Sequence, residues 1–253
     1  MTVRKNVRLI SKLETKPPYL VKPIVFEGLR KIGILKNLID DPIYEFIDEF
    51  LYNDVVASLF QRDIFLEEFS SFARKINKPI CAGGGVKSIE DFSDLIRSGA
   101  DKVSINTYAI NENPSIINQA AKLFGSQSVV VNIEAKKWKN EWECYSNSGK
   151  IPTGRNVIDW AREVEDRGAG EILLQSVDGD GLEEGFEIEL AKSVVENAGI
   201  PIVIASGIGK LEHIKDLILY ANPSGIAIAS ILHYKKYSSK QIYDYLKSES
   251  LIA

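Results

Sequence analysis

Two short motifs recur along this chain at a spacing of about half its length. Glu14 closes one apolar run and Glu134 closes another, an offset of 134 − 14 = 120 residues. Gly85 and Gly207 belong to two glycine-rich turns, an offset of 207 − 85 = 122 residues. Since two unrelated motifs repeat at nearly the same spacing, the sequence predicts a duplicated architecture. Each half would supply one acidic strand end and one glycine turn.

Short apolar runs alternate with amphipathic segments, which is the pattern of βα units that build a parallel sheet. The apolar runs predict eight strands, at residues 7–13, 50–54, 79–82, 102–105, 128–134, 171–175, 201–205 and 225–229. The amphipathic segments predict helices at residues 63–76, 89–98, 114–124, 157–167, 188–197 and 211–220. No linker rich in Pro, Gly or Ser separates the halves, and 253 residues is a usual size for one α/β barrel. We therefore expect residues 1–253 to form a single (β/α)8 TIM barrel with a half-barrel internal repeat.

Composition narrows the possible function classes. With 31 basic and 35 acidic residues the net charge is −4, so no basic surplus is present to bind a nucleic-acid backbone. No apolar run reaches the length of a membrane span, and the first residues lack the features of a signal peptide. Cys81 and Cys144 are expected to be free thiols in the reducing cytoplasm. His213 and His233 form no zinc spacing with them, so we expect neither a metal nor a cofactor.

Two carboxylates are the candidate catalytic groups. Barrel chemistry takes place at the carboxyl ends of the strands, where Glu14 and Glu134 would face each other. Such a pair can serve as general acid and base if their surroundings separate their pKa values. The alternative is that they are solvated or form salt bridges to Lys12 and Lys136. Because Lys12 is two residues before Glu14, it points to the same inward side, where it needs a charged partner.

The two glycine turns are candidate phosphate sites. A glycine permits a positive φ and a close approach of the backbone, so that N–H groups can point at an anion. Polar or small residues follow the next strand in each half. The residues concerned are Gly85, Asn106 and Thr107 in the first half and Gly207, Ala229 and Ser230 in the second. Either cluster alone could be a tight turn, but their repetition favours a small-molecule substrate with two phosphates.

Two further segments belong to the same end of the barrel. The connection over residues 15–34 is long and carries several basic residues, which is typical either of a lid over an anionic substrate or of a solvated loop. The DGDG run at residues 178–181 lacks the other oxygen ligands of a calcium loop. Contacts to a phosphate or substrate are therefore its better interpretation.

Charged residues also mark the opposite, N-terminal ends of four predicted strands. They are Arg8, Glu49, Lys102 and Glu171. Together they would form a ring at the bottom of the barrel, and residues at that face usually contribute to stability. The residues alone therefore indicate a stabilising ring of salt bridges.

Four strings in this chain are specific to a known family. They are GADKVSINT (99–107), FGSQSVVV (124–131), RGAGEILL (167–174) and IASGIGKLEH (204–213). On these strings the chain resembles the cyclase subunit family of imidazole glycerol phosphate synthase, the ammonia-using half of a glutamine amidotransferase. The similarity extends over nearly the whole chain, and it implies a (β/α)8 barrel with half-barrel symmetry.

The resemblance implies a role for each candidate residue. Glu14 and Glu134 stand where that family has two catalytic aspartates, and Lys22 stands at its lid lysine. The two phosphate sites of the family correspond to Gly85, Asn106, Thr107, Asp180, Gly181, Gly207, Ala229 and Ser230. The family's gate for ammonia corresponds to Arg8, Glu49, Lys102 and Glu171. A glutaminase subunit would dock on the N-terminal face of the barrel and deliver ammonia through this gate.

The implied reaction belongs to histidine biosynthesis. Ammonia attacks a bisphosphate nucleotide, the phosphoribulosyl-formimino aminoimidazole carboxamide nucleotide. The products are imidazole glycerol phosphate and the aminoimidazole carboxamide ribonucleotide.

The chain also departs from the family pattern. Besides the two glutamates, the departures are Lys12, Asn132 and Gln175 in the barrel interior and Pro23 in the lid segment. They leave open a paralogue that delivers ammonia for amidation of a surface-polysaccharide sugar. A non-catalytic ammonia conduit and a sugar-phosphate isomerase also stay open as functions of such a barrel.

Overall fold

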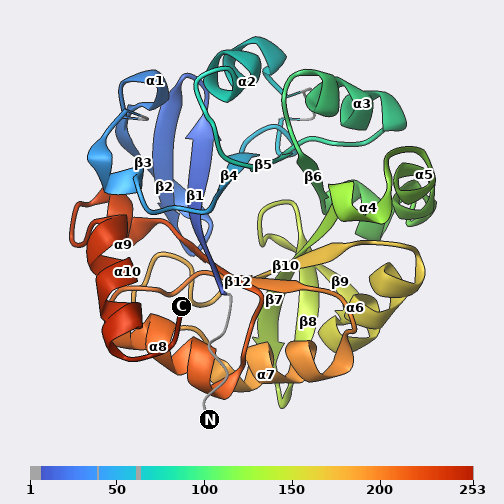
Figure 1. Ribbon diagram of the computed structural model, residues 1–253. Coiled ribbons are helices and arrows are strands. Elements are labelled where there is room, and N and C mark those ends of the chain that lie inside the picture. The colour runs from blue at the N-terminus through green and yellow to red at the C-terminus, as the bar shows by residue number, and fades with distance from the viewer. Residues whose placement is uncertain (1–6, 39, 61–63, 253) are drawn as a thin grey trace.

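The computed structural model describes residues 7–38, 40–60 and 64–252. Within them, eight parallel strands close into a barrel (Figure 1). These strands are β1 (Arg8–Lys16), β4 (Glu49–Asp54), β5 (Ile80–Gly83), β6 (Lys102–Ile105), β7 (Val129–Trp138), β10 (Glu171–Ser176), β11 (Ile202–Ala205) and β12 (Gly225–Ile228). Pairing of β12 with β1 and of β7 with β10 closes the ladder. The predicted (β/α)8 barrel is confirmed.

Helices cover the outside of the barrel (Figure 1). The longer ones are α2 (Leu66–Ala73), α3 (Ile89–Arg97), α5 (Ser115–Phe124), α6 (Val157–Asp166), α7 (Ile188–Asn197), α8 (Leu211–Tyr220) and α10 (Ser239–Ser248). The short segments are α1 (Leu35–Leu38), η1 (Pro42–Tyr44), α4 (Thr107–Asn111), η2 (Ser126–Ser128) and α9 (Ser230–His233). Over the part of the chain described, no helix has the length and apolar character of a membrane span.

Side-chain caps explain where some of these helices begin. Ser88 accepts a hydrogen bond from the Asp91 amide at the start of α3, and Asn156 does the same for Ile158 at the start of α6. The predicted helices at 188–197 and 211–220 match α7 and α8. By contrast, α2 is shorter than the predicted 63–76, and Asp63 lies outside the described residues.

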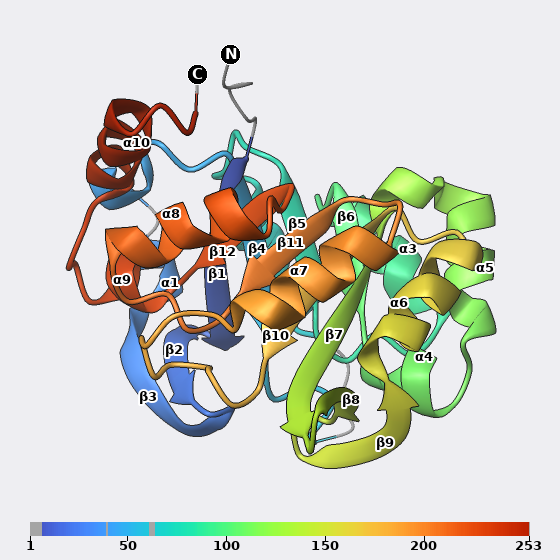
Figure 2. The same ribbon diagram turned by 90° about the horizontal axis from the view of Figure 1, so that it is seen from below.

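Each half of the barrel begins with a long strand that continues into an antiparallel hairpin. β1 pairs with β2 (Tyr19–Ile24), which pairs with β3 (Glu27–Ile34). In the same way, β7 pairs with β8 (Glu141–Ser146), which pairs with β9 (Ile151–Asn156). Both hairpins project from the same end of the barrel, away from α10 (Figure 2). The segment 15–34, expected to be a lid or a loop, is therefore mostly a hairpin that repeats in the second half.

The two hairpins correct the expected position of the catalytic candidates. β1 and β7 run past the predicted strand ends, so Glu14 and Glu134 lie within strands rather than at their ends. Glu14 is in register with Asn53, and Glu134 is in register with Gln175. Asn53 and Gln175 are the next-to-last residues of β4 and β10. Both carboxylates therefore still lie at the level where the neighbouring strands end.

Alternation along the strands divides the buried side chains between two cores. Outward-facing residues pack against the helices in a large apolar cluster that includes Tyr52, Phe69 and Trp160. Inward-facing residues form a smaller cluster on the barrel axis: Ile10, Leu51, Cys81, Val130, Leu173, Val203, Ala205 and Ala227. The inner cluster fills the middle of the barrel and separates the charged groups at its two ends.

Candidate active site

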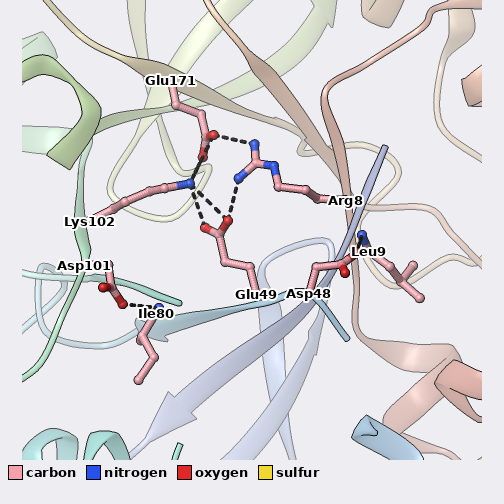
Figure 3. A network of polar contacts seen from close by, with 8 residues as sticks. All are labelled: Arg8, Leu9, Asp48, Glu49, Ile80, Asp101, Lys102 and Glu171. Carbon is pink, nitrogen blue, oxygen red and sulfur yellow. Dashed lines mark hydrogen bonds and ion pairs between the residues drawn. The ribbon is translucent and has the colours of Figure 1, made fainter. Parts of the chain in front are cut away.

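Four charged side chains form a ring at the N-terminal end of the barrel (Figure 3). Arg8 donates to the carboxylates of Glu49 and Glu171, each at 2.5 Å. The Lys102 ammonium lies 3.0 Å from Glu49 Oε2 and 3.2 Å from Glu171 Oε1. Both carboxylates are buried, so each depends on the two cations for neutralisation. The structure thus brings together the four residues that were expected to meet there.

Two further carboxylates hold the strand starts beside this ring (Figure 3). Asp48 Oδ2 accepts the Leu9 amide at 2.7 Å, and Asp101 Oδ2 accepts the Ile80 amide at 2.8 Å. These bonds satisfy backbone N–H groups at the starts of β1 and β5. They fix the ends of two strands that are close to the ring.

A polar layer lies between the inner apolar cluster and the carboxylates. Gln175 Nε2 donates to Asn132 Oδ1 at 2.7 Å, and Asn132 Nδ2 lies 3.4 Å from Glu134 Oε1. Gln175 is 1% exposed, and its Oε1 has no hydrogen-bond partner among the described residues. The layer therefore offers an unused acceptor inside the barrel.

Glu14 is held between two ammonium groups. Lys12 Nζ lies 2.7 Å from Glu14 Oε1, and Lys22 Nζ lies 2.6 Å from Glu14 Oε2. Lys22 also binds Asp180 Oδ1 at 3.0 Å. Burial alone would raise the pKa of Glu14, but attraction to Lys12 and Lys22 outweighs it and lowers the pKa to about 2. The expected Lys12–Glu14 salt bridge is confirmed, and Glu14 is ionised at neutral pH.

Glu134 has a different environment. Its Oε2 accepts the Gly149 amide at 2.7 Å, from the turn between β8 and β9. Lys136, the expected alternative partner, instead lies 5.3 Å from the centre of the Tyr145 ring. Burial raises the pKa of Glu134 to about 7, against the lowering effect of the Gly149 amide. The two glutamates therefore differ in protonation, as an acid–base pair requires.

The first predicted phosphate site forms a pocket, which we call the first anion pocket. It is lined by Asn53, Asp54, Ser58, Gly84, Gly85, Asn106, Thr107, Asn132, Glu134 and Ser148, among others. Gly84 has a φ of +102°, and a Cβ there would lie 2.2 Å from the Asp54 carbonyl oxygen, so only glycine fits. The lining contains two carboxylates and, in the described chain, neither lysine nor arginine.

The second predicted phosphate site forms the second anion pocket. Its lining includes Lys12, Lys22, Asp180, Gly181, Ser206, Gly207, Ala229 and Ser230. Gly207 has a φ of +74°, and a Cβ there would lie 2.1 Å from the Gly185 carbonyl oxygen. The structure therefore brings together Lys22 and all of the residues expected in the second half. It adds Lys12, which the glycine motif did not indicate.

A larger cavity of about 460 Å³ connects the two catalytic candidates. Glu14 and Glu134 both line it, and so do side chains of the β2–β3 hairpin and of the segment after β4. Among these are Phe26 and the largely exposed Phe60. One cavity of small-molecule size therefore reaches both carboxylates.

One buried histidine supports this site and was not recognised from the sequence. His233 Nε2 lies 2.9 Å from the Lys12 carbonyl oxygen, and His233 Nδ1 lies 3.2 Å from the Tyr44 hydroxyl. Burial lowers the pKa of His233 to about 4, so the ring is neutral. With Nε2 donating and Nδ1 accepting from Tyr44, the ring links β1 to α9 and η1. The other histidine, His213, accepts the Gly209 amide at 3.2 Å and lies in α8.

The raised pKa of Glu134 predicts a specific pH dependence of stability. At pH values between 4.5, the ordinary pKa of glutamate, and about 7, Glu134 is protonated more often in the folded protein than in the unfolded chain. Stability from this group is therefore lost as pH rises toward 7. From pH 5 to pH 7, the unfolding free energy of the wild type should fall by about 2 kcal/mol relative to Glu134→Gln. Urea denaturation of both proteins at each pH measures this difference, and parallel pH profiles would contradict the assignment.

A closed parallel barrel with buried carboxylates and two glycine-turn pockets at the carboxyl ends of its strands is the arrangement of a (β/α)8-barrel enzyme. The profile of the family described as "Histidine biosynthesis protein" matches residues 39–238. The chain is 41% identical over 245 residues to the imidazole glycerol phosphate synthase subunit HisF of Thermococcus onnurineus. It is 39% identical over 244 residues to that of Clostridium botulinum and 39% identical over 245 residues to that of Pyrococcus furiosus. Each match covers 96% of both chains.

The chain therefore belongs to the histidine biosynthesis family. The family that the four strings predicted is confirmed. The same relatives confirm the predicted class, a synthase subunit, and the predicted pathway, histidine biosynthesis. They favour the cyclase over the surface-sugar alternative. The curated relatives are each named as a subunit, so they act within an assembly.

Proposed function

We propose that this chain is the cyclase subunit of a cytoplasmic glutamine amidotransferase and works as a single domain. It forms imidazole glycerol phosphate and the aminoimidazole carboxamide ribonucleotide from a bisphosphate nucleotide and ammonia, and the substrate oxygen that ammonia replaces leaves as water. The observation that carries this proposal is the placement of both glutamates in one cavity, with an anion pocket in each half of the barrel. A substrate with a phosphate at each end would span that cavity.

The environments of the two glutamates assign them different parts in catalysis. Glu134, with a pKa of about 7, can donate a proton and take it back near neutral pH. The nitrogen that leaves in C–N cleavage needs such a proton, and ring closure releases one. In the structure without substrate, Glu14 is ionised and its charge is neutralised by the two lysines. Asp180, itself a carboxylate, acts by holding Lys22 in place.

Ammonia would reach the cavity from the opposite end of the barrel. The ring of Arg8, Glu49, Lys102 and Glu171 surrounds the axis there, and the inner apolar cluster lies beyond it. Neutral ammonia crosses such an apolar layer more readily than ammonium, because an unpaired ion is costly to bury. A glutaminase subunit docked on this N-terminal face would release ammonia directly at the ring.

Anion binding tests the pockets on which the proposal rests. Crystals soaked in phosphate should show one anion at Gly85, Asn106 and Thr107 and a second at Gly207 and Ser230. The second anion pocket should fill at the lower concentration, because Lys12 and Lys22 line it, whereas no cation of the described chain lines the first. Empty pockets at saturating phosphate, with the glycine N–H groups turned away, would refute the bisphosphate substrate.

A further inference from the structure

In this structure, ion pairs hold the Glu14 carboxylate in one position. Each carboxylate oxygen has its own ammonium partner, Lys12 on one side and Lys22 on the other. All three side chains are at least 97% buried. A carboxylate that is held in this way cannot accept a proton near neutral pH, so it is inactive as a base. Some event must loosen these contacts if Glu14 is to exchange protons.

The same two lysines line the second anion pocket. They meet there with Gly207 and Ser230, and with Ser206, whose buried hydroxyl has no hydrogen-bond partner in the described chain. The free space inside is only about 20 Å³, which is room for about one water molecule. A phosphate group that enters this space fully therefore displaces a side chain of the lining. The lysine side chains have more rotatable bonds than any other side chain of the lining.

The number of carboxylate partners distinguishes the two lysines. Lys22 binds both Glu14 and Asp180, whereas Glu14 is the one carboxylate bound to Lys12 in the described residues. Lys12 therefore gives up a single ion pair when it turns toward the pocket. Its movement is the less costly of the two, and a phosphate with close to two negative charges is a stronger partner than one carboxylate.

We propose that Lys12 is a phosphate-binding residue, and that a phosphate in the second anion pocket draws Lys12 away from Glu14. Binding of the substrate then frees one oxygen of Glu14 for acid–base catalysis. This inference rests on the proposed function, because it takes the pocket to be the site of one substrate phosphate. It gives the lysine that departs from the family pattern a role in coupling substrate binding to catalysis.

Other charged groups near Glu14 do not provide this coupling. Asp180, after β10, carries the same sign as Glu14 and stays paired with Lys22. His233, on α9, is neutral and binds the Lys12 backbone rather than its ammonium. Glu183 lines the pocket but is paired with Lys236. Lys12 and Lys22 are therefore the cations next to a bound phosphate, and Lys12 is the one that it draws away from Glu14.

The first test uses sulfate as the probe and reads the two pockets separately by amide NMR. The Gly207 amide reports the second anion pocket, and the Gly85 amide reports the first. In Lys12→Met, sulfate binding read at Gly207 should weaken by at least about tenfold, the loss of one charge-assisted hydrogen bond. Binding read at Gly85 should be nearly unchanged. The matched control is Lys16→Met, on the same strand but outside the second pocket, with an expected change below about threefold.

The second test needs only the wild type. The Glu14 carboxyl carbon, assigned with Glu14→Gln, is followed by NMR from about pH 7 to about pH 3. Without sulfate Glu14 should remain ionised throughout, and with saturating sulfate its titration midpoint should move into this range. Unchanged Glu14 titration, together with equal sulfate affinity in the wild type and Lys12→Met, would overturn the proposal. Absence of sulfate binding at Gly207 in the wild type would instead overturn the proposed substrate site.

Discussion

Replacing Glu134 with glutamine is expected to lower ammonia-dependent turnover by roughly a hundredfold or more, the scale of a lost acid–base group. Glutamine has the same size as glutamate, but its side-chain amide neither gains nor loses a proton near neutral pH. It can still accept the Gly149 amide through its oxygen, so the fold of the β8–β9 turn should persist. Steady-state rates with the bisphosphate nucleotide and saturating ammonium salt measure the effect.

Phosphate affinity is the control for this variant. Binding at Gly207 and Ser230 should survive in Glu134→Gln, because Glu134 does not line the second anion pocket. The turnover of Glu14→Gln is measured for comparison. This variant removes a carboxylate that is also the ion-pair partner of two buried lysines. If neither variant changes turnover, the glutamates have no chemical role, and other residues of the cavity carry the reaction.

Replacing Lys102 with alanine is expected to reduce the unfolding free energy by about 3 kcal/mol, because removing one partner of a buried ion pair leaves the other charge uncompensated. Glu49 and Glu171 would share Arg8 alone. Urea denaturation at neutral pH measures the loss. If the ring also passes ammonia, glutamine-dependent turnover with a glutaminase subunit should fall by a larger factor than turnover with free ammonium.

Lys102→Arg is the matched control, because it keeps the positive charge between the two carboxylates. It should recover most of the lost stability. Equal losses of glutamine-dependent and ammonium-dependent turnover in Lys102→Ala would show that the ring is a salt-bridge network and nothing more. A glutaminase docked at this face would then lose its support.

The hairpins show where the sequence stopped being informative about the fold. The eight barrel strands were predictable because each is a short apolar run between amphipathic helices. The β2 strand contains Pro23 and a buried Lys22, and β3 contains Gly28 and Gly33, so neither has the alternation typical of a strand. Their pairing with β1 is a tertiary effect that outweighs local propensity.

The candidate site was predictable in its members but not in all of its contacts. Strand alternation alone placed Lys12 beside Glu14, and strand starts alone placed Arg8 and Lys102 at one end of the barrel. The second partner of Glu14 is Lys22, which reaches it because β2 turns back and runs antiparallel to the end of β1. The bond between His233 and the Lys12 carbonyl joins residues 221 positions apart, and no local pattern indicates it.

The central claim is that this chain performs the cyclase reaction with glutamates in both catalytic positions. Turnover of the bisphosphate nucleotide by the isolated wild-type chain, with saturating ammonium salt, tests it most directly. We expect imidazole glycerol phosphate and the aminoimidazole carboxamide ribonucleotide to form in equal amounts. A folded protein that binds phosphate in both anion pockets, yet forms neither product, would contradict the claim.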